Sequence, residues 1–334
     1  MSVPAFADIS KSANDLLNKD FYHLSAGTIE VKSNTPNNVA FKVTGKSSHE
    51  KVTSGNLEGK YSDKSLGKAP KPSKRKLKIT AFSMGPMKVP GHRAWPLSFS
   101  VYISERASAL LMIYRRTGLT LTQTWNTANT LESKVELNDS IAKGLKAEGV
   151  FAFLPAAQSK GAKLNLTFKQ SAFHGRAFFD LLKGPVANVD AVIGHEGFVA
   201  GASAGYDVQK AAVTGYSAAV GFQAPSYSAA VTATDNLSVF AASYYHKVNS
   251  QVEAGAKATW NSKSGNTVGL EVASKYRLDP VSFAKAKIND RGVAAVSYNV
   301  LLRPGVTLGL GASFDTQKLE QATHKVGTSF TFES

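Results

Sequence analysis

The sequence contains no cysteine and no long uninterrupted apolar run. Without cysteine there is neither a disulfide framework nor a thiolate metal site. No stretch of about 18 apolar residues occurs, which excludes a transmembrane helix. The first residues lack the basic and apolar regions of a secretory signal, and early acids such as Asp8 and Asp15 are not typical of a transit peptide. These absences favour a soluble protein, but they do not test for a β-barrel, whose strands give a weaker signal.

Motifs of catalysis and cofactor binding are absent as well. The sequence has no Gly-x-x-x-x-Gly-Lys-Ser/Thr loop and no His-Glu-x-x-His motif, and Gly309-x-Gly311 lacks the third glycine of dinucleotide binding. His195-Glu196 has no second acidic or histidine cluster at a fixed spacing. The sequence therefore predicts no enzyme, no cofactor and no metal site.

The excess of positive charge is concentrated in one segment. The chain has a formal charge of +15, and residues 68–117 carry eleven Lys or Arg against one acid, Glu105. Five of the twelve prolines lie in the same segment. Elsewhere basic and acidic residues are interleaved, which is not the basic stripe typical of nucleic-acid binding. Nucleic acid is therefore not expected as a partner.

Residues 68–117 also differ in pattern from the sequence around them. The segment begins with Lys-Ala-Pro-Lys-Pro-Ser-Lys-Arg-Lys, which cannot cross lipid as a strand, and ends with an apolar run without alternation. The codons of Gly67-Lys68 and Thr117-Gly118 can contain a donor-like GTAAG and an acceptor-like CAG. We predict an insertion translated from a retained intron, with a genuine lineage-specific loop as the alternative. If translated, the segment is expected to be a basic loop or disordered chain.

The first 20 residues have the periodicity of an amphipathic helix. Charged residues that include Lys11, Asp15 and Lys19 occupy one side. The apolar residues of the other side are Phe6, Ile9, Ala13, Leu16 and Leu17. Such a helix could pack on a soluble core, or it could lie against a pore wall with its charged side in water.

From about Phe21 onward the apolar residues recur with a period of two. Segments such as Lys163–Lys169, Val306–Phe314 and Lys325–Phe332 have one apolar and one polar face, as strands do. The predicted strands run about nine to eleven residues in general, which suits a tilted crossing of hydrocarbon, whereas soluble strands average about five or six. The alternation predicts an all-β membrane protein, a closed barrel of about 16 to 20 strands with an aqueous lumen.

Longer motifs point to a family. They include the following stretches: Asn14-Asp15-Leu16-Leu17-Asn18-Lys19, Trp125-Asn126-Thr127-Ala128-Asn129-Thr130-Leu131, Tyr276-x-x-Asp279-Pro280-x-Ser282, Ala286-Lys287-Ile288-Asn289-Asp290 and Leu302-Arg303-Pro304-Gly305. Over residues 1–67 and 118–334 the chain resembles the mitochondrial outer-membrane porins, the voltage-dependent anion channel family, and its fungal members in particular. The resemblance implies a 19-stranded transmembrane barrel spanning residues 21–334, with the first and last strands parallel and the helix of residues 1–20 in the lumen.

The resemblance also implies a function and an address. The chain is expected to be a voltage-gated, anion-preferring pore of the mitochondrial outer membrane that passes ATP, ADP, phosphate and other small metabolites. Lys325-x-Gly327-x-x-Phe330-x-Phe332 fits the insertion signal that such barrels carry in their last strand. Membrane lipids are the expected surroundings, and a homo-oligomer is compatible with this interpretation. The alternative is a soluble or peripheral β-barrel that carries a lipid or another small ligand.

Strand parity and the resemblance together select candidate site residues. Parity places Lys60 and Lys146 on the water side, where excess lysine concentrates anions. By resemblance, Lys11, Asp15 and Lys19 on the helix and Lys60 and Lys146 on the wall match charged positions linked to selectivity, gating or nucleotide contact.

One position departs from the family pattern. Parity places Gln123 on the lipid face, where some animal relatives carry a glutamate, a costly charge in lipid. Functions attributed to that glutamate are therefore not expected in this chain.

Overall fold

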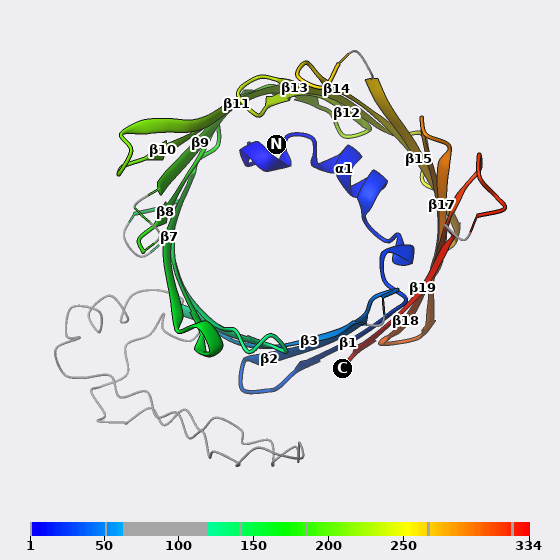
Figure 1. Ribbon diagram of the computed structural model, residues 1–334, viewed down its shortest axis with the longest axis horizontal. Coiled ribbons are helices and arrows are strands. Elements are labelled where there is room, and N and C mark those ends of the chain that lie inside the picture. The colour runs from blue at the N-terminus through cyan, green and yellow to red at the C-terminus, as the bar shows by residue number, and fades with distance from the viewer. Residues whose placement is uncertain are drawn as a thin grey trace.

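The computed structural model of the protein describes residues 2–50, 52–62, 119–139, 142–182, 184, 186–265, 268–321 and 324–334. In this part of the chain nineteen strands form one closed sheet, which Figure 1 shows as a ring around the N-terminal segment. The predicted all-β barrel with 19 strands is therefore confirmed. No helix among the described residues is long and apolar enough to cross a membrane.

The strands contain eight to twelve residues each, the length expected for a tilted crossing of hydrocarbon. Their bounds are β1 Gly27–Asn34, β2 Val39–Ser47, β3 Thr53–Ser62, β4 Leu119–Asn126, β5 Leu131–Asn138, β6 Leu145–Leu154, β7 Ser159–Lys169, β8 Phe173–Asp180, β9 Val186–His195, β10 Phe198–Asp207, β11 Ala212–Gln223, β12 Tyr227–Thr234, β13 Val239–Lys247, β14 Val252–Asn261, β15 Val268–Asp279, β16 Ser282–Asn289, β17 Val293–Arg303, β18 Val306–Asp315 and β19 Lys325–Glu333.

Strands that follow one another in the sequence pair in antiparallel fashion, and the barrel closes between its first and last strands. β1 and β19 pair in parallel, with a register that runs from Gly27 opposite Thr328 to Lys32 opposite Glu333. An odd number of alternating strands leaves the two ends of the sheet pointing the same way, so closure has to be parallel. The predicted parallel seam is confirmed.

The alternation of side chains separates an apolar outer face from an inner face. Val189, Ile193 and Phe198 point outward and are half to two-thirds exposed. Their neighbours on the inner face contact the N-terminal segment, as Val192 does. Because every backbone group in a closed barrel pairs within the sheet, the outer face can be wholly apolar without leaving an open edge.

Strands β3 and β4 are neighbours in the sheet although 56 residues separate them in the sequence. Ser62 at the end of β3 lies opposite Thr120 in β4. The predicted insertion, residues 68–117, lies outside the described residues.

The N-terminal segment is less continuous than the single helix predicted for residues 1–20. It contains the 3₁₀ turn η1 (Phe6–Asp8), the helix α1 (Lys11–Asn18) and the 3₁₀ turn η2 (Tyr22–Leu24). The helix ends before Asp20, which has a left-handed φ of 60°. A straight 20-residue helix would span about 30 Å. A chain that turns between η1 and α1 follows the curved wall more closely than a straight helix would.

Candidate functional site

The N-terminal segment lies inside the barrel, along the inner face of β9–β19 (Figure 1). Its first half buries Val3 and Ile9 against Val192, Val199 and neighbouring alanines of the wall. A second cluster joins the apolar side of α1 to the wall through Leu16, Leu17, Ala273 and Tyr245. The predicted placement of an amphipathic helix against the pore wall, with its apolar side facing the sheet, is confirmed.

Glycines on the inner face make room for this segment. A Cβ atom at Gly221 would lie 3.1 Å from Ile9, and one at Gly255 would lie 3.0 Å from Leu16. At Gly327 an added Cβ would collide with the backbone oxygens of Tyr22 and Ser25. Sequence reasoning missed these glycines as site residues. Glycine and alanine at water-side positions of β9–β19 were the signal that could have revealed them.

Polar side chains of the wall bond to the same segment. Lys257 donates to Asn14 Oδ1 at 3.2 Å, His174 donates to the carbonyl of Val3 at 3.2 Å, and Asn299 donates to the Tyr22 hydroxyl at 2.5 Å. A charged donor, Lys285, adds a further contact, with its Nζ 2.6 Å from the carbonyl oxygen of Lys19. The segment is thus attached along its length, by apolar and by polar contacts.

The three predicted helix residues form one chain of ion pairs on the lumen side of α1. Asp15 Oδ2 lies 3.3 Å from Lys11 Nζ and 2.7 Å from Lys19 Nζ. Burial alone would raise the pKa of Asp15, but hydrogen bonds from Lys19 and Lys11 outweigh it and hold the pKa below its usual range. The same bond raises the pKa of Lys19. With Asp8 at 3.9 Å from Lys11, the positive and negative charges of this chain balance.

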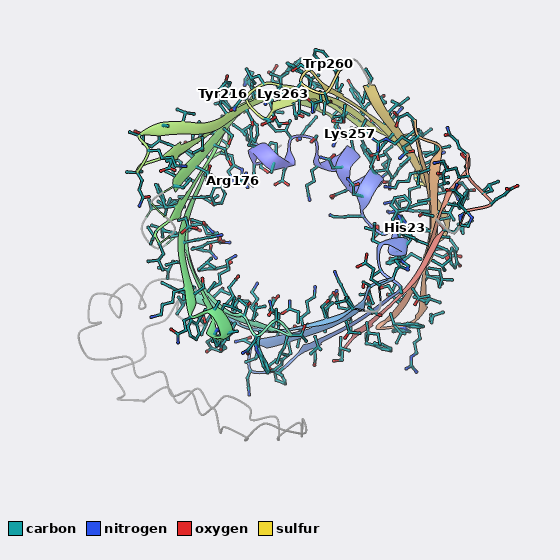
Figure 2. The ribbon with its side chains drawn as sticks, viewed as in Figure 1. His23, Arg176, Tyr216, Lys257, Trp260 and Lys263 are labelled. Carbon is teal, nitrogen blue, oxygen red and sulfur yellow. The ribbon has the colours of Figure 1, made fainter. Side chains whose placement is uncertain are left out.

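The two predicted wall lysines lie on strands that the N-terminal segment does not contact. Register places Lys60 opposite Ala40 and Thr122, and Lys146 opposite Asn138 and Thr167, all on the inner face. Figure 2 shows the same alternation at two labelled residues, Lys257 inside the ring and Trp260 on its outer side. The predicted inward orientation of both lysines agrees with the register of the sheet.

Their electrostatic surroundings differ. Lys146 joins Lys134, Glu136 and Glu148 in a network of two lysines and two glutamates, with Lys146 and Glu148 in direct contact and Lys134 2.6 Å from Glu136. Lys60 is exposed and makes no ion pair within the described residues. Sequence reasoning did not find the network around Lys146, because it depends on which residues of β5 and β6 lie opposite one another.

The open wall as a whole carries an excess of positive charge. In strands β2–β7 the inner face bears seven lysines and four glutamates. The lysines are Lys42, Lys46, Lys60, Lys134, Lys146, Lys163 and Lys169, and the glutamates are Glu58, Glu132, Glu136 and Glu148. The structure therefore brings Lys11, Asp15 and Lys19 together on α1 and leaves Lys60 and Lys146 on the open wall.

The lipid-face position of Gln123 follows from the same register. Gln123 lies opposite Gly59 and Ser133 and shares its face with Trp125, which is 53% exposed. An uncharged side chain at this depth avoids the cost of a carboxylate in hydrocarbon.

Known proteins share this sequence over its whole length. Residues 2–79 and 99–327 match the family model described as eukaryotic porin. The chain is 70% identical over 334 residues to the mitochondrial outer membrane protein porin of Neurospora crassa, with 100% of both chains covered. It is 44% identical to the protein of the same description in Candida albicans, with 99% of both chains covered. It is 35% identical to non-selective voltage-gated ion channel 1 of Saccharomyces cerevisiae, with 100% of both chains covered.

A closed barrel with an internal N-terminal segment is a membrane pore, and the chain belongs to the eukaryotic porin family. It is a voltage-gated channel of the mitochondrial outer membrane. The family decides between the two predicted function classes in favour of the pore, and against a soluble or peripheral carrier.

Proposed function

We propose that the channel prefers anions and passes ATP, ADP, phosphate and other small anionic metabolites by diffusion, without a chemical step. The observation that carries the proposal is the excess of lysine over glutamate on the open wall of β2–β7. A wall with net positive charge raises the local concentration of anions and lowers their barrier to entry. Lysine is suited to this task, because it is a hydrated point charge on a flexible stem.

The site residues take different parts in this proposal. Lys60 acts as an uncompensated wall charge, whereas Lys146 acts within a network whose charges cancel. With Asp8, the residues Lys11, Asp15 and Lys19 form a balanced chain on the N-terminal segment, so they contribute a local pattern of charge and little net field. Anion preference is therefore expected to arise chiefly on the open wall.

Planar bilayers test the proposal directly. The purified chain and a 284-residue form without residues 68–117 should both give large conductance steps. In a KCl gradient, the reversal potential of both should indicate that chloride is more permeant than potassium. The short form is the matched comparison for the contribution of the basic segment. Equal permeability of the two ions, or preference for potassium in the fully open state, would contradict the proposal.

We further propose that residues 68–117 derive from a retained intron and are dispensable for the pore. The support is the mismatch in sequence together with the pairing of β3 and β4, since Ser62 and Thr120 lie opposite each other. Removing the 50 residues leaves residues 63–67 and Gly118 to join the two strands, a connection of ordinary length. Transcript sequencing should find most mature messages without these codons. Messages that retain them, with matching peptides from purified mitochondria, would overturn the idea.

A further inference from the structure

We infer that Lys285 is the positioning residue that fixes the C-terminal end of helix α1 to the barrel wall. Lys285 lies on β16, on the inner face, and its side chain is only 2% exposed. It is the one lysine among the described residues that is buried. A buried ammonium group is costly unless its three donors find acceptors, so its partners are informative.

The partners of Lys285 are two backbone carbonyls at the end of helix α1. Nζ donates to the carbonyl oxygen of Lys19 at 2.6 Å and to that of Asp15 at 3.3 Å. Most of the last carbonyls of a helix receive no hydrogen bond from an N–H of the same helix, and they form the negative end of its dipole. A fixed positive charge at this end therefore satisfies the carbonyls and interacts favourably with the dipole.

Two further groups surround the ammonium. Asp20 Oδ2 lies 3.9 Å away, and the ring of Phe21 lies 4.9 Å from Nζ, within the range of a cation–π contact. Both residues follow directly after the helix, at the point where the chain turns away from it. Lys285 thus contacts the end of the helix and the start of the next turn at the same time.

No other wall contact of the segment combines these features. His174 donates to a single carbonyl, that of Val3, Asn299 donates to the Tyr22 side chain, and Lys257 reaches only the side chain of Asn14. Lys285 is the one wall lysine in the described part of the chain that donates to backbone oxygens of the N-terminal segment. The C-terminal end of α1 is therefore held by a charged donor, whereas the turn at Ile9 is held by apolar packing and by a bond from Gln223 to the Ile9 carbonyl.

Lys275 offers a matched control for the charge. It lies directly opposite Lys285 in the register of β15 and β16, points to the same side and lines the same cavity of about 300 Å³ beside α1. Its ammonium lies over the ring of Phe283, on the wall itself, 4.3 Å from the ring centre. Removing the charge at Lys275 therefore changes the local field without removing a bond to the helix.

Hydrogen exchange in lipid vesicles tests the inference. In Lys285→Met, amides of residues 13–20 should exchange about tenfold faster or more than in the unsubstituted chain, because a bond to a charged donor has about that effect. Lys275→Met should leave them within about twofold. Peptides from β2–β8 report whether the barrel itself is intact. Equal exchange of the helix in Lys285→Met and Lys275→Met would overturn the inference.

The absence of cysteine allows a rescue that separates bonding from packing. Lys285→Cys, unfolded and alkylated with 2-bromoethylamine before refolding, regains an ammonium at the same chain length. The same variant alkylated with iodoacetamide has a neutral amide instead. Slow exchange of the helix should return with the amine and not with the amide. Return with both adducts, or with neither in a folded barrel, would contradict the assigned role.

A channel readout extends the test and rests on the established channel function. Lys285→Met pores should spend less time in the fully open state at a fixed low voltage than Lys275→Met pores, because α1 is less firmly held. Unchanged open times together with fast helix exchange would overturn the link to conduction. If neither the parent chain nor any variant conducts, the channel function is contradicted. The hydrogen-exchange result alone would then test the role of Lys285.

Discussion

The inner face of the barrel has two parts with different chemistry. Strands β2–β7 present lysines, glutamates and threonines to the lumen. Where the N-terminal segment crosses β9–β19, many wall positions are glycine, alanine or serine, and the buried positions there include Ala219, Ala273, Ala295 and Ser297. One half is built to face ions in water, and the other is built to hold a piece of the same chain.

This difference shows where each property of the pore resides. The segment of residues 2–25 carries two lysines and three aspartates, so the segment itself adds no net positive charge to the lumen. The proposed anion preference is a property of the barrel wall, whereas the position of the helix depends on shape and on a few bonds. Substitutions in the two halves are therefore expected to affect different measurements.

The largest effect is expected from filling a wall glycine on the covered half. In Gly327→Ala the new methyl group would meet the backbone oxygens of Tyr22 and Ser25, which cannot move aside as a side chain would. We expect a loss of about 3 kcal/mol in the free energy of unfolding, measured by urea titration in detergent, or release of residues 20–25.

Gly45→Ala on β2 is the matched substitution on the lipid side of the open half. Nothing lies within 4 Å of a Cβ at Gly45, so the free energy of unfolding should be unchanged or slightly higher. If both variants lose the same stability, the contact between residues 22–25 and the wall is not what requires glycine at position 327.

Charge reversal on the open wall should have a smaller effect, and this effect should be on ion selectivity rather than on stability. Lys60→Glu changes the wall charge by two units, which at about one Debye length alters the anion-to-cation permeability ratio by about twofold. Lys146→Glu should change it less, because Lys134 of the same network lies close enough to pair with the glutamates that Lys146 leaves. Reversal potentials in a salt gradient measure both. A larger shift in Lys146→Glu than in Lys60→Glu would show that the ion-pair network does not compensate charge.

The smallest effect is expected from pH, and only on the covered half. Burial lowers the pKa of His23 below its ordinary 6.5, and the charges of Lys287 and Lys325 lower it further. The docked form therefore binds a proton less readily than the free form, and docking loses stability as the pH falls through that ordinary value. Amides of residues 20–25 should exchange faster at about pH 5 than at about pH 7.5, after correction for intrinsic rates.

The variant His23→Gln supplies the control for this prediction. It removes the titrating ring and keeps His49, which bonds to the carbonyl of residue 23. The pH difference should disappear in this variant. Its persistence would assign the effect to another group.

The sequence was informative where the structure depends on local alternation. Parity alone placed Lys60, Lys146 and Gln123 on the correct faces, because a strand turns each successive side chain to the other side. The amphipathic pattern of the first residues likewise predicted which side of the helix meets the wall. The parallel seam and the strand number came from the resemblance to the family.

Long-range pairing could not be predicted in the same way. The bond between Lys285 and Lys19 joins residues 266 positions apart, and the network of Lys146 depends on the register of β5 and β6. The break in the N-terminal helix near Ser10 depends on the curvature of the wall. None of these leaves a periodic signal, since each follows from how distant segments meet.

The parallel seam places a condition on how the barrel is assembled. β1 has its second partner only when β19 exists, and the ion pair of Lys32 with Glu333 at 2.6 Å joins residues 301 positions apart. The sheet therefore cannot close while the chain is still being synthesised, and closure is the step with the highest loop entropy. Residues 22–25, just before β1 in the sequence, pack against Gly311 of β18 and Gly327 of β19. The closure that seals the wall therefore also completes the surface on which these residues lie.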